Sequence, residues 1–167
     1  AKEDVRVLIS ADGYLKRSSV RSFNSSEQND NGLREDDQIV FEETLSTLDH
    51  LFLFTNKGNL IYRPVHELLD TKWKDTGAHL SQEVGLASDE QVIRVDVFAD
   101  LQQDYNFLLA TSDGYIKQVK MSDLQPGRTY KTRATMVMKL KDPAAEVVNI
   151  ARVKPEATTE IIVFTQM

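Results

Sequence analysis

Hydrophobic positions fall into short runs that recur along the chain. Apolar triplets at 7–9, 52–54, 108–110 and 162–164 are each followed by a hydroxyl residue, namely Ser10, Thr55, Thr111 and Thr165. A glycine stands three residues later in the first three copies, as Gly13, Gly58 and Gly114, and an aliphatic residue stands two beyond it. An apolar run, a glycine turn and a second run predict a β-hairpin, with the glycine at positive φ.

The two strands of each expected hairpin have different patterns. The incoming strand is apolar at consecutive positions, which predicts a strand buried on both faces in the middle of a sheet. The outgoing strand alternates, so Leu15 and Ile116 are expected to face inward, and Lys16 and Lys117 outward.

A second pattern follows each hairpin. Polar loops at 25–32, 70–77 and 126–134 precede the sequences LREDDQIV (33–40), LASDEQVI (86–93) and LKDPAAEVV (140–148). A further apolar stretch in each copy gives about four strands per unit. Helical periodicity is nowhere sustained, although 65–70 and 121–126 could each form one turn.

The repeat spacing predicts an all-β, propeller-like fold. The hydroxyl residues lie 45, 56 and 54 residues apart, and four strands in such a period are typical of a propeller blade. An irregular β-sandwich would explain the hairpins but not the second pattern. We expect blades at 1–48, 49–104 and 105–158, with 159–167 as the first strand of a truncated fourth unit, so the chain is expected to be part of a longer array.

Composition and charge restrict the function. The chain has 167 residues, no cysteine and a net charge of −6. No apolar run reaches the length of a membrane span, and we expect a cytoplasmic location. Residues 115–141 contain seven Lys or Arg residues and one acid, a local balance of +6. Acidic runs such as 35–37 are read as solvated faces, whereas the basic stretch points to a polyanionic partner.

Three phrases carry a resemblance to a known family. VLISADGYLKRSSVRSF, FLFTNKGNLIYRPVHEL and LLATSDGYIKQVKMSDL resemble the C-terminal repeats of bacterial type IIA topoisomerase A subunits. The resemblance implies a β-pinwheel, whose blades exchange a strand with their neighbours. It also implies that the disc binds and bends duplex DNA around its perimeter and presents it to a catalytic core for ATP-dependent strand passage.

The resemblance also bears on the branch of the family and on partners. Gyrase repeats carry a basic box, QRRGGKG, whereas the corresponding loop here, SSEQNDNG, has no basic residue. This favours topoisomerase IV. The implied partners are double-stranded DNA, the ATPase B subunit and the rest of the A subunit, with nucleoid association and no membrane integration. The parent would be an ATP-hydrolysing, DNA-cleaving isomerase whose active site lies in a different domain.

Phosphate binding requires Lys or Arg on an exposed rim. The outgoing strands and the residues after them supply Lys16, Arg17, Arg21, Arg63, Lys117 and Lys120, and the polar loops supply Lys72, Lys74, Arg128, Lys131 and Arg133. Each could instead be an ordinary surface charge, but the basic loop 126–134 as a whole favours contact with DNA. Trp73, between two lysines, is expected to pack against its own blade rather than to stack on nucleic acid.

No motif for catalysis is present. The three histidines lack metal-ligand spacing, and there is no phosphate-binding glycine loop or nucleophile elbow. We expect no cofactor and no active site in this chain. The alternative to a DNA-binding module is a propeller-type platform for protein–protein interaction, for which the acidic net charge is natural.

Overall fold

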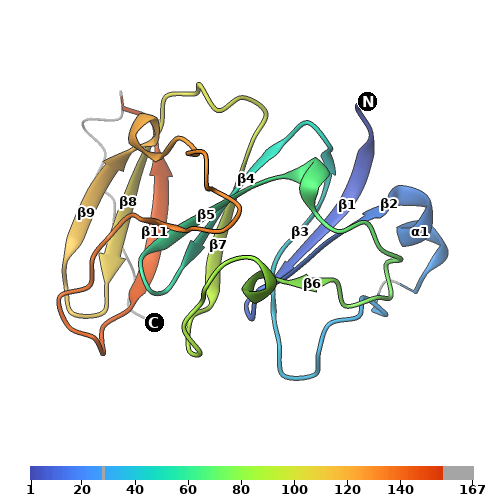
Figure 1. Ribbon diagram of the computed structural model, residues 1–167, viewed down its shortest axis with the longest axis horizontal. Helices are drawn as coiled ribbons and strands as arrows, with labels where there is room; N and C mark the ends of the chain where they lie inside the picture. Colours follow the sequence, from blue (N-terminus) through green and yellow to red (C-terminus); the bar gives the residue numbers. More distant parts are fainter. Residues whose placement is uncertain (28, 156–167) are drawn as a thin grey trace.

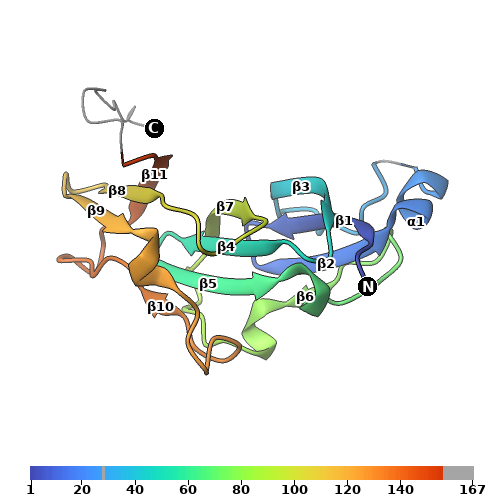
Figure 2. The same cartoon turned by 90° about the horizontal axis from the view of Figure 1, so that it is seen from above.

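Three antiparallel sheets lie side by side in the computed structural model, which describes residues 1–27 and 29–155 (Figures 1 and 2). We call residues 1–48, 49–104 and 105–158 units 1, 2 and 3. Unit 1 contains β1 (Asp4–Ser10), β2 (Tyr14–Ser19), α1 (Val20–Ser25) and β3 (Ile39–Ser46). Unit 2 contains β4 (His50–Thr55), β5 (Asn59–Pro64), η1 (Val65–Glu67), β6 (Ala78–His79), η2 (Leu80–Gln82) and β7 (Val92–Phe98). Unit 3 contains β8 (Asn106–Thr111), β9 (Ile116–Lys120), η3 (Met121–Leu124), β10 (Thr135–Met136) and β11 (Val147–Val153).

The three hairpin turns are equivalent, as predicted. Gly13, Gly58 and Gly114 have φ of 102°, 83° and 92°, a region that side chains rarely adopt. Each glycine N–H donates to the carbonyl of the hydroxyl residue three positions earlier, at 3.1, 3.2 and 3.1 Å. The repeat register of the sequence is therefore the register of the fold.

The strand order confirms that the incoming strands lie inside the sheets. The first two sheets have the orders β3–β1–β2–β6 and β7–β4–β5–β10, and the third has the order β11–β8–β9. The fourth strand of each complete sheet comes from the following unit: β6 pairs with β2, and β10 with β5. Units 2 and 3 each contain the four strands expected, and unit 1 contains three. One strand of each four, β6 or β10, pairs in the sheet of the preceding unit, as the family resemblance implied.

The outer edge of β9 has no such partner within residues 1–27 and 29–155. Ile116 is 65% exposed there, although Leu15 and Leu60 at the same repeat position are 5% and 2% exposed. Ile116 was expected to face inward, and this is wrong: Leu15 and Leu60 are buried in core clusters that they share with the following unit, whereas no described segment buries Ile116. The expected fourth-unit strand, at 159–167, lies outside them.

The hydrophobic cores lie between units rather than within them. Leu51, Leu53 and Ile61 of the middle sheet pack in one cluster with side chains of unit 1, whereas Phe52 and Phe54 pack in a second cluster with unit 3. β3 and β7 also contact each other. The middle sheet is consequently buried on both faces, which explains the unbroken apolar run of β4.

Main-chain hydrogen bonds join each of the first two turns to the unit that follows it. Leu80 and Val92 of unit 2 donate to the carbonyls of Gly13 and Ala11, at 2.8 and 2.9 Å. Their counterparts in unit 3, Val137 and Val147, donate to the carbonyls of Gly58 and Asn56, both at 2.8 Å. We call the contact between units 1 and 2 the first seam and that between units 2 and 3 the second seam.

A single helical turn follows each outgoing strand. The turns predicted near 65–70 and 121–126 are the short helices η1 and η3. The helix α1 at the same position in unit 1 was not predicted, and its first turn is capped by Ser19, whose hydroxyl accepts from Ser22 N–H at 3.0 Å. In the described part of the chain, no helix is both long and apolar enough to span a membrane.

Candidate nucleic-acid interface

Lys16 is fully buried, so its predicted outward position is wrong. Its ammonium donates to the main-chain carbonyls of Asn31, Trp73 and Asp75, the last at 2.6 Å. The nitrogen also lies 4.4 Å from the centroid of the Trp73 ring. Strand alternation alone placed Lys16 in solvent, but loop 70–77 of unit 2 covers this face of β2 and provides two of the three acceptors.

Burial changes the titration of Lys16. Loss of solvation lowers the pKa of its ammonium from 10.5 to about 8, although the carboxylates of Asp75, Glu42 and Asp30 oppose the shift. The side chain therefore stays predominantly charged at pH 7 and can donate to several carbonyls at once.

Arg63 performs a similar function at the second seam, and its expected outward position is also wrong. It is 2% exposed, and its guanidinium donates to the carbonyls of Tyr62, Tyr130 and Lys131 at 2.8, 3.1 and 2.8 Å. Glu83 lies 3.5 Å away. Two of the acceptors belong to the basic loop 126–134, so Arg63 holds that loop instead of facing solvent.

Arg17 is half-buried. Its Nε donates to the carbonyl of Leu68 at 3.0 Å, and its own main chain exchanges hydrogen bonds with Leu69 and Thr71, both at 3.0 Å. Part of its guanidinium is thus committed to holding the chain that enters loop 70–77. Contact of Arg17 with DNA stays a prediction.

The other eight predicted cations are exposed. They are Arg21, Lys72, Lys74, Lys117, Lys120, Arg128, Lys131 and Arg133. The structure brings the first three together: Arg21 from α1 and Lys72 and Lys74 from loop 70–77 line one cavity of about 530 Å³. Their contact with DNA also stays a prediction.

The basic loop of unit 3 is held against unit 2 by an additional pair that the sequence did not indicate. The hydroxyl of Tyr130 donates to the Glu67 carboxylate, with distances of 2.7 and 2.9 Å to its two oxygens. That hydrogen bond, with burial as a smaller cause, raises the pKa of Tyr130 to about 12. Lys131 lies 3.6 Å from the same carboxylate. Glu67 and Tyr130 are 63 positions apart in the sequence, so no local pattern predicts their contact.

Lys117 and Lys120 lie on the uncovered strand β9. Both line a cavity of about 540 Å³ together with residues of β10. The Lys117 ammonium donates to the carbonyl of Val137 at 2.9 Å. Lys117 and Lys16 each stand three residues after a turn glycine. Lys16 is buried, but no described segment buries Lys117.

Trp73 is a structural residue, as predicted, but its partner differs from the expected one. The side chain is 0% exposed and meets the ring of Phe23 edge-on, with the centroids 4.9 Å apart. Phe23 and Lys16 both belong to unit 1, so the indole packs across the first seam rather than against its own blade. Burial excludes stacking of the indole on nucleic acid in this conformation.

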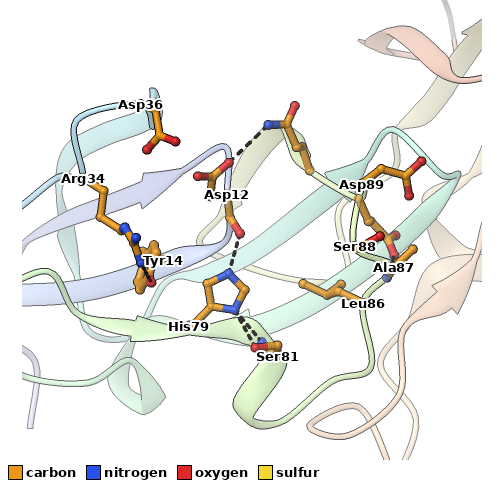
Figure 3. A pocket seen from close by; sticks show the side chains of 12 residues that line it. Asp12, Tyr14, Arg34, Asp36, His79, Ser81, Leu86, Ala87, Ser88 and Asp89 are labelled. Atoms are coloured by element: carbon orange, nitrogen blue, oxygen red, sulfur yellow. Dashed lines mark hydrogen bonds between the residues drawn. The ribbon is translucent and has the colours of Figure 1, made fainter.

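A separate cavity of about 610 Å³ has an acidic lining (Figure 3). Asp12, Asp36 and Asp89 are among its residues, with Arg34 as its one Lys or Arg side chain. His79 joins its two sides: Nε2 donates to the Asp12 carbonyl at 2.7 Å, and Nδ1 accepts from Ser81 N–H at 3.1 Å. An excess of carboxylates repels phosphate, so this cavity is no candidate for DNA contact.

One acidic residue assigned to a solvated face is buried. Asp37 is 8% exposed, and its carboxylate accepts from the N–H groups of Asp12 and Gln38 at 3.0 and 2.7 Å. Asp37 thus supports the turn of the first hairpin, and only Glu35 and Asp36 of that run are exposed. Over the described ranges, no group of three or more His, Asp or Glu side chains could hold a metal ion.

Comparison with known proteins identifies the repeat. The family described as DNA gyrase C-terminal domain, beta-propeller, matches residues 7–41, 49–99 and 105–154. These three segments follow the three units and together make up most of the chain. The propeller-type fold expected from the repeat spacing is therefore confirmed.

Curated relatives and a solved structure agree with this assignment. The chain is 42% identical over 154 residues to the A subunit of DNA topoisomerase 4 from Streptococcus pyogenes, and 39% identical over 155 residues to that from Streptococcus pneumoniae. Each alignment covers 92% of this chain and 19% of the relative. A crystal structure of the C-terminal domain of DNA topoisomerase IV matches with a TM-score of 0.81 and 34% identity, over 92% of this chain and 46% of that one.

Proposed function

Because the chain belongs to the family of DNA gyrase C-terminal domains, we propose that it is a non-catalytic module that binds duplex DNA through the phosphate backbone. The observation that supports this most directly is that its cations have two different roles, one structural and one exposed to solvent. Lys16 and Arg63 are buried and hold loops of the following unit, while five other cations are displayed in solvent on those loops. Cations on loops that are already ordered lose less conformational freedom on binding.

Phosphate contacts of this kind give low sequence specificity. Lys and Arg side chains that contact the backbone fix the position of a duplex but carry little sequence information. Cations at successive seams could follow a curved duplex. Bending a site of 20–30 base pairs by tens of degrees costs about 1–6 kcal/mol, which contacts along the curve would offset.

The role of the longer protein is part of the proposal. The chain spans about a fifth of the length of its curated relatives, which are A subunits of DNA topoisomerase 4. We place it in a topoisomerase IV A subunit, where it would bend a duplex and present it to the catalytic core for ATP-dependent strand passage. Its partners would then be DNA, the ATPase B subunit and the rest of the A subunit, in the cytoplasm at the nucleoid, and the module itself needs no cofactor.

A salt series with the whole chain tests this function. Binding of a fluorescent duplex is measured at several salt concentrations for the wild type and for the triple variant Arg128→Ala, Lys131→Ala, Arg133→Ala. Loss of up to three phosphate contacts should lower the log–log salt slope by roughly 2–3. Folding should change by about 0.5 kcal/mol or less, since the side chains are exposed.

The matched control removes acidic charge instead. Glu35→Ala with Asp36→Ala, leaving the buried Asp37 intact, should bind equally well or slightly more tightly because repulsion is removed. Wild-type protein that binds no duplex at low salt would overturn the proposal. The alternative, a platform for protein–protein interaction, would then be favoured.

A further inference from the structure

We propose that the first seam contains a preformed phosphate-binding site, composed of Arg21, Lys72 and Lys74 around the cavity of about 530 Å³. The ligand is a phosphodiester of the DNA backbone, so this inference rests on the proposed function. It differs from the sequence-based expectation, in which the strongly basic unit 3 dominates binding.

The site is preformed because loop 70–77 is attached to unit 1 along its length. Trp73 N–H donates to the hydroxyl of Ser22 at 3.0 Å, and the Trp73 carbonyl accepts from Lys16. Lys16 also binds the Asp75 carbonyl, and the Thr76 hydroxyl donates to the Gly32 carbonyl at 2.8 Å. The buried indole therefore fixes the chain between Lys72 and Lys74, and their main chain needs no further ordering when DNA binds.

The charges of this site are free for a ligand. Among the described residues, no carboxylate lies within 4.0 Å of the cationic nitrogens of Arg21, Lys72 or Lys74. At the second seam, by contrast, Lys131 lies 3.6 Å from Glu67, so part of its charge is already neutralised. Glu27 and Asp30 line the first-seam cavity, but the three cations outnumber these two acids.

The chemistry of the lining fits a phosphodiester. Arg21 supplies a planar guanidinium, which can bind two phosphate oxygens at once. Lys72 and Lys74 add two point charges from the opposite unit. The Ser22 hydroxyl accepts from Trp73 N–H, which leaves its own proton to donate to a phosphate oxygen.

The decisive experiment compares two variants of equal charge change in the whole chain. The first-seam variant is Arg21→Ala, Lys72→Ala, Lys74→Ala, and the matched variant is Arg128→Ala, Lys131→Ala, Arg133→Ala. Anisotropy of a fluorescent 20-base-pair duplex is measured over a salt series. We expect the first-seam variant to lower the log–log slope by roughly 2–3 and to lower it more than the matched variant does.

The possible results separate this inference from the proposed function. If the wild type binds duplex and the first-seam variant keeps its affinity and slope, the site is wrong while the function stands. If the wild type itself does not bind, the function fails. Glu27→Gln with Asp30→Asn should tighten binding, because it removes the two acids of the cavity; unchanged or weaker binding would contradict the site.

A second measurement does not depend on the triple variant being folded. Since the chain has no cysteine, Lys74→Cys provides a single thiol at the site, and Asp36→Cys provides one at the acidic cavity. Each is incubated with a duplex that carries a thiol-reactive group on one backbone phosphate. Cross-linking of Lys74→Cys well above that of Asp36→Cys is expected, and equal yields would overturn the proposed site.

Discussion

At the scale of single residues, two buried cations explain how the basic loops are displayed. Lys16 and Arg63 stand three and five residues after their turn glycines, yet both bind main-chain carbonyls of the next unit's loop. Lysine and arginine differ in length and shape, so both side chains can reach the loop of the next unit although they start from different positions in the repeat. A buried carbonyl without a donor would cost about 1–3 kcal/mol, so these contacts decide where the loop lies.

Tyr130 gives a prediction of pH dependence. The Glu67 carboxylate raises its pKa to about 12 in the folded protein, against about 10 when unfolded. A raised folded pKa contributes stability that is fully present below pH 10 and is lost as the pH rises toward 12. The free energy of unfolding of the wild type should therefore fall between pH 10 and 12 relative to that of Tyr130→Phe, as measured by urea denaturation. A constant difference over that range would refute it.

At the scale of elements, the hairpin turn is the part of a unit that hydrogen-bonds to the unit that follows. The turn carbonyls receive main-chain hydrogen bonds from the following unit, two at the first seam and three at the second. The chain must therefore approach the turn closely, and a glycine there serves two purposes. It adopts positive φ, and at the second seam it leaves room for the neighbouring backbone.

The glycines of two turns separate these two purposes. A Cβ at Gly58 would lie 2.1 Å from the Met138 carbonyl oxygen, whereas a Cβ at Gly114 would have no neighbour within 4 Å. Gly114→Ala should cost about 1–2 kcal/mol for the backbone conformation alone. Gly58→Ala should cost about 1–3 kcal/mol more, because the packed backbone must move. Chemical denaturation measures both, and equal losses would show that close approach does not matter.

The third hairpin presents a different edge from the other two. Ile116 of β9 and Met136 of β10 are each 65% exposed, and the outer edge of β9 has no strand partner among residues 1–27 and 29–155. An unpaired apolar edge favours association with another strand.

At the scale of the whole molecule, units 1 and 2 are each completed by the unit that follows. Exchanged strands, shared cores and buried cations all connect unit 1 to unit 2 and unit 2 to unit 3. The seams therefore repeat along the array, and the cations of loops 70–77 and 126–134 recur with them. A long duplex should contact more than one seam.

A length series tests the contact of one duplex with both seams. Duplexes from 8 to 30 base pairs are titrated with wild-type protein, and we expect the log–log salt slope to rise with length and then to level off. For long duplexes the effects of the two triple variants on log affinity should add, since the seams are separate sites. If the first-seam and third-unit variants together have no more effect than one alone at every length, one duplex does not contact both seams.

Local sequence determined the units of this protein. An apolar triplet, a hydroxyl residue and a glycine at a fixed interval specify a hairpin through backbone sterics and burial, which act within a few residues. The equivalent turns at Gly13, Gly58 and Gly114 therefore follow from the sequence alone. The repeat spacing likewise predicted three similar sheets, and the unbroken apolar runs predicted that β1, β4 and β8 lie inside them.

Tertiary structure alone decided which charges face solvent. Lys16 and Lys117 have the same position in the repeat, but loop 70–77 buries the first and no described loop buries the second. Asp36 and Asp37 are neighbours in one acidic run, but only Asp37 is buried, where its carboxylate accepts hydrogen bonds from main-chain N–H groups. Strand alternation gives the face of a side chain but not what covers that face. The cover of Lys16 comes from a loop of the next unit, 57 to 59 residues further along the chain, and Asp37 accepts a hydrogen bond from Asp12, 25 residues before it. The residues next to Lys16 and Asp37 in the sequence therefore do not indicate their burial.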